Sequence, residues 1–380
     1  MVLAKTLSAS DIANQDYTFI VHEHMRTWLA PYISGPCRLV GISESSSSRV
    51  RKYLRQVPLL RRLYRQVRRR IYGEDRIPVS DGYVEQNEFD LVHFPTPTGY
   101  LTKIPTIYQP WDLQHVHYPE FFGQEEVERR EKQYRAFCNQ AAYVCVQAEW
   151  TKEDVRKQYD IPEERICVIP WGSVLDAYSP VGSEHLSRAK EKYALPGQFF
   201  YYPAVTWRHK NHIVILRALR FLKERGVRPD VYFTGMTTEH KVMLDRAASE
   251  LGVLPQLHYL GFVHPEDLQA MYFLSTALIF PSKFEGFGLP ILEAFWARTA
   301  VISSTATTLP EVAKDGALYF DTDSPQELAR QMQSVWENPT MRQSLIEKGT
   351  MILSSYSMRK TVEAFQELYE RAVEHHMRRD

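Results

Sequence analysis

The sequence lacks the features that mark membrane-spanning, secreted and zinc-stabilised proteins. No apolar run is long enough to cross a bilayer, and the first residues, MVLAKTLSASDIANQ, lack the apolar stretch of a secretory signal. There are only four cysteines, none in a Cys-x-x-Cys pair and none beside histidines at zinc spacing. Because each cysteine lies in or beside an apolar run, we expect buried free thiols and a cytoplasmic protein.

An excess of one charge and a nucleotide-binding glycine loop are also missing. The chain has 46 Lys and Arg against 46 Asp and Glu, so no overall attraction to nucleic acid is expected. Neither Gly-x-Gly-x-x-Gly nor a P-loop occurs, which disfavours a nicotinamide enzyme or an NTPase. The 380 residues, 44% hydrophobic and 24% charged, are typical of a globular protein with two domains.

Short apolar runs alternate with amphipathic segments along most of the chain. In the first half they predict strands at 17–21, 37–42, 89–94, 104–108, 143–147 and 166–170. Residues 1–15 are expected to be irregular, and a turn-rich passage at 171–180 is expected to lead into a linker that ends near Pro196. From Phe199 onwards strands and helices alternate regularly, which predicts a doubly wound parallel sheet.

The segment 277–311 is the most informative. Its start, 277–280, predicts a buried parallel strand, and Gly286 and Gly288 predict a turn that lets backbone approach a ligand. Glu285 then lies on the loop at the strand's carboxyl end, and Glu293 lies about one turn into the following helix. Open α/β sheets bind ligands at that edge, and the helix start favours an anion such as a diphosphate.

The pattern PS-x-x-EGFGLP-x-LEA, followed by S-x-x-x-x-LPE, resembles the donor-binding segment of the retaining glycosyltransferases of family 4. The segments VQAEWTKEDVRKQYDIPEERICVIPWG and YSMRKTVEAFQELYE resemble other parts of these enzymes. The resemblance implies the GT-B fold, in which two Rossmann-like, doubly wound α/β domains face a cleft. We expect an acceptor-side domain over 1–185, a nucleotide-sugar-binding domain over 186–355, and a C-terminal helix over 356–380 that crosses back to the first domain.

The resemblance also implies roles for the acids and the glycine turn. Glu285 would contact hydroxyls of the donor sugar, and Glu293 would contact the ribose. The sugar–phosphate junction would be lined by Gly286, Phe287, Gly288 and Leu289. Thr308 and Leu309 would add contacts to the diphosphate.

Two basic residues are predicted to neutralise the leaving diphosphate. Lys210, in the HKN of 209–211, matches the family's phosphate-binding lysine. Many members have an arginine five residues earlier, where this chain has Val205, so Arg208 is its expected substitute. The family further implies a front-face reaction in which the leaving phosphate deprotonates the acceptor. Neither a metal nor a cofactor is expected, and the donor is expected to be GDP-mannose or a UDP-hexose.

The loop DLQHVHYPEFF, 112–122, is similar to one in bacterial family 4 enzymes, many of which are mannosyltransferases that build surface polysaccharides. Many relatives have His-Asp-Leu where this chain has Trp111 and Asp112 followed by leucine. Three alternatives follow: His115 or His117 replaces the missing catalytic histidine, Trp111 stacks on a sugar, or the histidines only make loop hydrogen bonds. A second departure is the N-terminus, where the family's first strand and glycine-rich loop are absent or divergent.

Residues 49–72 contain ten basic residues and no acid. After Pro58 the apolar residues recur at helical spacing, so 59–72 predicts a basic amphipathic helix. One interpretation is contact with an anionic membrane at its inner face, close to a lipid-linked acceptor. The alternative is a packed helix with a solvated charged face. Nucleic-acid binding is disfavoured, because no known binding module accompanies the patch.

Three functions remain as hypotheses at this point. The first is a retaining, metal-independent hexosyltransferase that transfers to a glycan or lipid-linked acceptor in surface polysaccharide synthesis. The second is a catalytically weak GT-B protein that serves as a scaffold for another transferase, which the altered N-terminus and Trp111 motivate. The third is a sugar-nucleotide epimerase or phosphorylase on the same fold, which would act without an added glycan acceptor.

Overall fold

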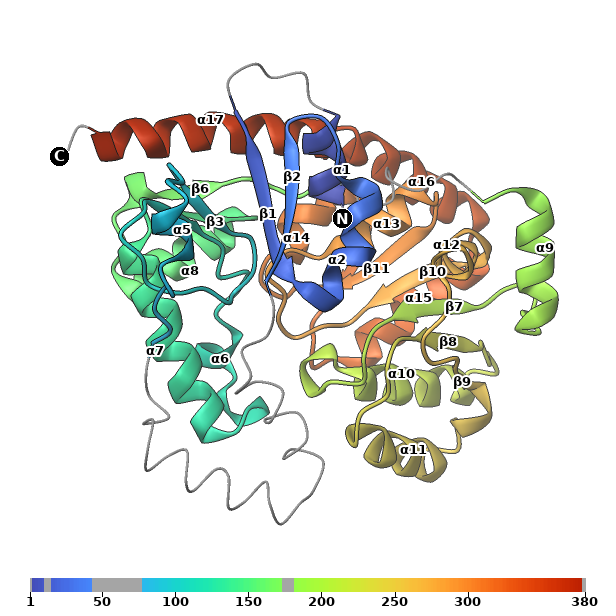
Figure 1. Cartoon of the computed structure of the whole chain (residues 1–380). Coiled ribbons are helices and arrows are strands. Elements are labelled where there is room, and N and C mark those ends of the chain that lie inside the picture. Colours follow the sequence, from blue (N-terminus) through green and yellow to red (C-terminus); the bar gives the residue numbers. More distant parts are fainter. Residues whose placement is uncertain (1, 10–14, 43–76, 173–180, 378–380) are drawn as a thin grey trace, which may run out of the picture.

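The computed structural model describes residues 2–9, 15–42, 77–172 and 181–377. Two α/β units lie next to each other, and a long C-terminal helix, α17 (Met358–Met377), runs along one side of both (Figure 1). In the part of the chain that the structure describes, no helix is both long and apolar enough to cross a membrane.

The second unit is built on a six-stranded sheet. Its strands are β7 (Phe200–Pro203), β8 (Val231–Thr234), β9 (Leu257–Tyr259), β10 (Ala277–Phe280), β11 (Ala300–Ser304) and β12 (Ala317–Phe320). They lie in the order β12-β11-β10-β7-β8-β9, and every pair is parallel. The chain therefore builds the sheet outwards in both directions from the β7–β10 pair. Such a reversal opens a crevice at the carboxyl ends of the central strands.

Helices cover both faces of this sheet. They are α10 (His212–Glu224), α11 (His240–Glu250), α12 (Pro265–Leu274), α13 (Leu289–Trp296), α14 (Leu309–Ala313), α15 (Pro325–Glu337) and α16 (Pro339–Leu353). Because both faces are covered, β8, β10 and β11 are buried along their whole length. This burial explains why these strands appear in the sequence as continuous apolar runs rather than alternating ones.

The first unit contains a four-stranded parallel sheet in the order β3-β4-β5-β6. Its strands are β3 (Val92–Phe94), β4 (Thr106–Tyr108), β5 (Tyr143–Val146) and β6 (Ile166–Val168). The helices of this unit are α5 (Tyr83–Gln86), α6 (Gln114–His117), α7 (Gln124–Gln140) and α8 (Glu149–Tyr159). The two parallel α/β units confirm the predicted fold class.

The two strands nearest the N-terminus depart from the expected arrangement. β1 (Tyr17–His22) and β2 (Cys37–Ile42), joined through α2 (Glu23–Leu29), pair in parallel as a separate two-stranded sheet. Within the described residues they do not extend the sheet of the first unit. Side chains of β1 and β2 pack outside that sheet instead: Cys37 of β2 packs with Leu7 of α1 (Val2–Ser8) and with Val362 of α17.

Two segments in which no helix was predicted are helical. Residues 1–15 contain α1 (Val2–Ser8), and the expected linker contains α9 (Ser183–Lys192). α1 buries Ala4 and Leu7 next to α17, and α9 docks on α12 through the buried carboxylate of Asp267. Both helices were missed because they are short and their packing partners lie far away in the sequence.

The C-terminal helix crosses back to the first unit, as predicted. Phe365, Leu368 and Ala372 of α17 are buried against Ile107 of β4 and Cys145 of β5. The predicted basic helix at 59–72 lies outside the described residues.

Candidate active site

Lys210 and Glu285 form an ion pair at the crevice between the two central strands of the second unit. Lys210 ends a short helical turn (Arg208–Lys210) after β7, and Glu285 lies in the loop after β10. Lys210 Nζ lies 2.5 Å from Glu285 Oε1, and the side chains are only 18% and 15% exposed. The sequence placed these two groups on separate strands, and the parallel pairing of β7 with β10 brings them together.

Further hydrogen bonds join the two loops that carry this pair. The Tyr202 hydroxyl donates to the backbone carbonyl of Lys210 at 2.9 Å. The Asn211 side chain donates to the Pro281 carbonyl at 3.1 Å, and the Lys283 amide donates to the His209 carbonyl at 2.8 Å. Lys210 and Glu285 are therefore held on connected backbone, which preorganises the charges.

Two threonines after β11 fix the backbone of the glutamate loop. Thr307 Oγ1 accepts from the Glu285 amide at 3.1 Å and donates to the Glu285 carbonyl at 2.8 Å. Thr308 Oγ1, which is fully buried, lies 3.1 Å from the Glu285 carbonyl and 3.0 Å from the Phe287 carbonyl. The Thr308 hydroxyl is thus engaged by the glutamate loop itself.

The turn at Gly288 requires a glycine. Its φ is 110°, and a Cβ atom there would lie 2.8 Å from Leu309 Cδ2. The following helix, α13, begins at Leu289 with proline in its first turn. Phe287 and Leu309 are buried apolar side chains packed in the core, so only their backbone is available to a ligand at this turn.

Glu293 lies one turn into α13, where Tyr272 of α12 donates a hydrogen bond to its Oε2 at 2.6 Å. Burial raises the pKa of this carboxyl above its usual value, whereas the hydrogen bond from Tyr272 lowers it. The site thus contains a hydrogen-bonded acid at the far end of the glycine turn from Glu285.

The first unit contributes a loop that rests on the glycine turn. A Cβ atom on Gly286 would overlap the carbonyl oxygen of Trp111 and lie 3.1 Å from Asp112 Cβ. Trp111 has a φ of 65°, its indole donates to the Pro95 carbonyl at 2.9 Å, and its side chain is 46% exposed. Burial raises the pKa of Asp112, and the nearby charge of Glu285 raises it further.

His117 lies at the boundary between the two units. Its Nε2 is 2.7 Å from Asp154 Oδ1, and its ring centroid is 5.2 Å from that of Phe284. Since Phe284 directly precedes Glu285, this histidine lies near the glutamate loop. Burial raises the pKa of Asp154.

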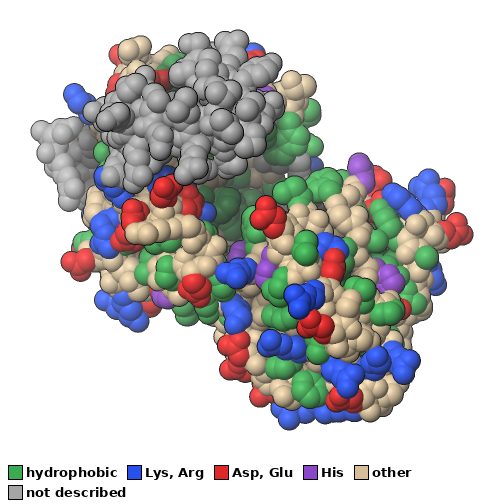
Figure 2. Space-filling view, turned by 90° about the horizontal axis from the view of Figure 1, so that it is seen from below, with side chains coloured by type: hydrophobic (Ala, Val, Ile, Leu, Met, Phe, Trp, Pro, Cys, Tyr) green, Lys and Arg blue, Asp and Glu red, His purple; other side chains and the backbone are tan. Residues whose placement is uncertain are grey.

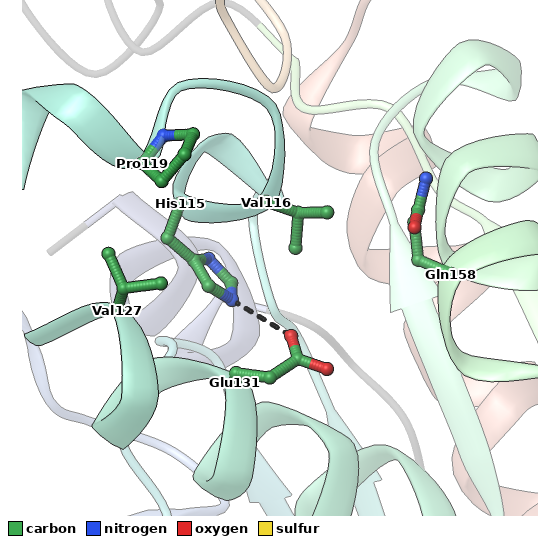
Figure 3. A pocket seen from close by; sticks show the side chains of 6 residues that line it. All are labelled: His115, Val116, Pro119, Val127, Glu131 and Gln158. Atoms are coloured by element: carbon green, nitrogen blue, oxygen red, sulfur yellow. Dashed lines mark ion pairs between the residues drawn. The ribbon is translucent and has the colours of Figure 1, made fainter. Parts of the chain in front are cut away.

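His115 lies elsewhere, inside the first unit. Its ring is fully buried, 3.3 Å from the Tyr159 hydroxyl and 3.5 Å from Glu131 Oε2, and burial lowers its pKa to about 4. Figure 3 shows the pocket that it lines, together with Val116, Pro119, Val127, Glu131 and Gln158. All these residues belong to the first unit, so the proposed catalytic role of His115 lacks structural support.

Arg208 points across the boundary rather than towards Glu285. Its Nη1 lies 3.5 Å from the carbonyl of Glu120 in the first unit, and its side chain is exposed. The space-filling view shows the surface hollowed between the two units, with basic and histidine side chains beside the hollow (Figure 2). Arg208 is therefore available to an anion that enters from the solvent.

Sequence reasoning missed several residues that shape this site: Phe284, Thr307, Asp154 and Glu311. Phe284 and Glu311 lie inside the recognised motif segment, but their roles depend on the facing unit. The paired Thr307 and Thr308 directly before Leu-Pro-Glu were the available signal, since adjacent hydroxyl residues at a helix start commonly bind backbone groups.

The fold and this site together define a GT-B glycosyltransferase. Residues 30–176 match the model described as "Glycosyltransferase Family 4", and residues 184–351 match the model "Glycosyl transferases group 1". The two matches together span most of the chain. The chain belongs to the glycosyltransferases of family 4.

Similar curated proteins include several mannosyltransferases. The chain is 24% identical over 315 residues to O-antigen chain mannosyltransferase B of Escherichia coli, covering 82% of this chain and 80% of that protein. It is 26% identical over 231 residues to O-antigen chain mannosyltransferase RfbU of Salmonella typhimurium, covering 60% of each. It is 32% identical over 185 residues to serotype-specific mannosyltransferase WbdA of Escherichia coli, but this match covers only 23% of that longer protein.

Solved structures share the fold at lower sequence identity. Anabaena Alr3699/HepE in complex with UDP-glucose has a TM-score of 0.72 at 15% identity, covering 97% of this chain and 94% of that one. A glycosyltransferase from Rickettsia africae has a TM-score of 0.70 at 15% identity, covering 98% and 94%. These likenesses support the GT-B architecture of the whole described chain.

Proposed function

We propose that this glycosyltransferase is a retaining hexosyltransferase that moves a hexose from a nucleotide-diphospho-sugar to a glycan or lipid-linked acceptor in surface polysaccharide synthesis. The observation that carries the proposal is the Lys210–Glu285 pair, which lies at the switch point of the sheet and faces the loop of Trp111 and Asp112. A nucleotide bound at this edge presents its diphosphate to the start of α13.

Lys210 and Glu285 are suited to bind the diphosphate and the sugar of such a donor, respectively. Lys210 supplies positive charge for the diphosphate, whose negative charge grows as it departs. Glu285 is placed to accept hydrogen bonds from sugar hydroxyls, and its carboxylate pairs with Lys210. This pairing holds the Lys210 ammonium in position at the edge where the diphosphate would bind.

Retention of the anomeric configuration fits a reaction on one face of the sugar. In that reaction the leaving phosphate oxygen takes the proton of the acceptor hydroxyl while the new glycosidic bond forms. The residues of the chain act by stabilising charge, and the proposal requires neither a metal nor a cofactor. Activity that persists in EDTA would support metal independence, and its loss would contradict it.

Mannose is the first candidate for the transferred sugar. The mannosyltransferases named above supply this suggestion, as does the loop after Asp112. The UDP-glucose in complex with the Anabaena protein makes a UDP-hexose the alternative. Isothermal calorimetry with GDP-mannose, UDP-glucose and UDP-galactose separates these donors.

Replacing Glu285 by Gln tests the assignment of the site. We expect transfer to fall about a hundredfold or more, because the variant loses the charge that the site directs at the sugar. The melting temperature should change little, since glutamine keeps a hydrogen-bonding oxygen near Lys210. The measurement is turnover with the preferred donor, with anomeric configuration of the product read by NMR.

Lys192→Met is the matched control, since Lys192 pairs with Asp267 on the outer helices α9 and α12. Unchanged turnover in Glu285→Gln would contradict the role of this residue. If no donor raises the melting temperature of the native chain, the scaffold hypothesis is favoured instead, because a bound ligand must stabilise the folded state. Conversion of the nucleotide sugar without an added glycan would indicate an epimerase or phosphorylase.

A further inference from the structure

Glu311 of the second unit caps a helix of the first unit. Its carboxylate accepts from the backbone amides of Glu149 at 2.8 Å and Trp150 at 3.1 Å, the first two residues of α8. The residue before them, Ala148, has no side chain that could cap the helix. A carboxylate at this position satisfies free amide groups and is favoured by the helix dipole.

The short helix that carries Glu311 also holds the glutamate loop. α14 begins at Leu309, directly after the two threonines that bond to the backbone at Glu285 and Phe287. Thr307 has a φ of 46°, which a β-branched residue adopts only under strain. One rigid segment of five residues therefore joins the Glu285 backbone to the start of α8.

Other contacts between the units converge on the same loop. Phe284 is only 3% exposed, and its ring lies among His117, Tyr118 and Trp150 of the first unit. The Thr151 hydroxyl donates to the Gly286 carbonyl at 3.3 Å. The residues on both sides of Glu285 are thus in contact with the facing unit, and α14 is a third connection.

We propose that Glu311 is a positioning residue, which holds the two units together by capping α8 and transmits this docked arrangement through Thr307 to Glu285. The proposal rests on the function proposed above, because Glu285 is taken as the group that contacts the donor sugar. It predicts that breaking the cap changes both the distance between the units and the efficiency of transfer.

The test measures both quantities on the full chain. Nitroxide labels at Lys157→Cys and Arg246→Cys, in a Cys167→Ser background, report the distance between the units by electron spin resonance. Both label positions are well exposed and lie on α8 and α11. We expect Glu311→Ala to broaden the distance distribution and to lower kcat/KM at least about tenfold, since it removes two charge-assisted hydrogen bonds.

Glu327→Ala is the matched control. The Glu327 carboxylate also accepts a backbone amide, from Asp321 at 2.9 Å, but this bond lies within the second unit. The control should keep the native distance distribution and kcat/KM. Circular dichroism and melting temperature confirm that each variant is folded.

Thr307→Val separates the two steps of the proposal. It should lower kcat while leaving the distance distribution unchanged, because it removes both Thr307 hydrogen bonds to the Glu285 backbone without touching α8. Thr307→Ser, which keeps the hydroxyl, should restore most of the activity. A native distance distribution and native kcat/KM in Glu311→Ala would overturn the proposal. If the native chain transfers no sugar, the proposed function fails, and the distance measurement alone still decides whether Glu311 holds the units together.

Discussion

Gly286 lies where the facing unit touches the glutamate loop. The Trp111 carbonyl lies so close to its Cα that even one methyl group would collide with backbone. A collision with backbone cannot be relieved by a side-chain rotation. At this position the absence of a side chain is therefore a requirement of the contact between the two units.

Replacing Gly286 by Ala should force the units apart. We expect kcat/KM to fall by roughly a hundredfold, the cost of misplacing reacting groups by about 1 Å. Steady-state kinetics with the preferred donor measure this effect.

Gly197→Ala is the matched control, because a Cβ atom at Gly197 would meet nothing within 4 Å. Native kcat/KM in Gly286→Ala would contradict the prediction, because it would show that the reaction does not depend on this contact between the units.

The residues of the site differ in how readily the sequence predicts them. Lys210 and Glu285 could be predicted to lie together, since each follows an apolar strand and parallel strands end at a shared edge. Thr307 and Glu311 could not, because their partners depend on how the loops and units dock. The different positions of the two histidines could not be predicted for the same reason: His117 faces the boundary, and His115 turns into the core.

At the scale of elements, α17 is tied to the first unit by a polar network inside an apolar contact. His93 of β3 lies between the Tyr369 hydroxyl at 2.9 Å and Gln109 Oε1 at 3.1 Å, and its ring packs on Phe365. Burial lowers the pKa of His93 from 6.5 to about 4. The neutral imidazole is therefore the form that the docked helix accommodates.

The pKa of His93 predicts a loss of stability in acid. Between pH 6.5 and about 4 the unfolded chain binds a proton at this residue that the folded chain does not, so stability falls as pH falls. His93→Gln should reduce this slope, because glutamine does not titrate. Urea unfolding at a series of pH values from about 7 to about 4.5 measures it.

His264→Gln is the control, since this side chain is 70% exposed. It should keep the native pH dependence. If the free energy of unfolding depends on pH equally in His93→Gln and in the native chain, protonation of His93 does not contribute to the loss of stability in acid.

Buried strands with continuous apolar runs were predicted well, and short helices were not. β7 and β10 begin within one residue of their predicted starts, because each apolar run is buried along all or nearly all of its length. α1 and α9 were missed, since the first depends on α17 and the second on Asp267. The separate pairing of β1 with β2 was also unpredictable, because a run of apolar residues does not specify its neighbour in a sheet.

At the scale of the whole molecule, charge is distributed unevenly along a neutral chain. Ten basic residues and no acid lie in 49–72, so the remainder of the chain is net acidic. An anionic surface would attract the basic segment 49–72 and repel the net acidic remainder of the chain. We therefore propose that this segment, which lies outside the described residues, brings the enzyme to an anionic membrane at the cytoplasmic face.

Changing Arg61, Arg65 and Arg68 together to Gln should weaken binding to vesicles that contain phosphatidylglycerol. We expect a loss of roughly a hundredfold, because each of the three basic residues near the surface contributes roughly 1 kcal/mol. Sedimentation with vesicles at low and high salt measures the effect.

The control changes Arg188, Arg246 and Arg359 to Gln, which removes the same charge from exposed positions elsewhere. Equal vesicle binding by the two triple variants would refute a specific role for 49–72.

The position of α17 at the end of the chain determines when the first unit can complete its fold during translation. Ile107 and Cys145 of the first unit are covered by a helix that the ribosome makes only after the entire second unit. During translation the first sheet therefore emerges with an uncovered apolar face, and it stays so until the second unit has been made. Because exposed apolar surface and strand edges promote aggregation, the nascent first unit is most prone to aggregate before its last helix has been made.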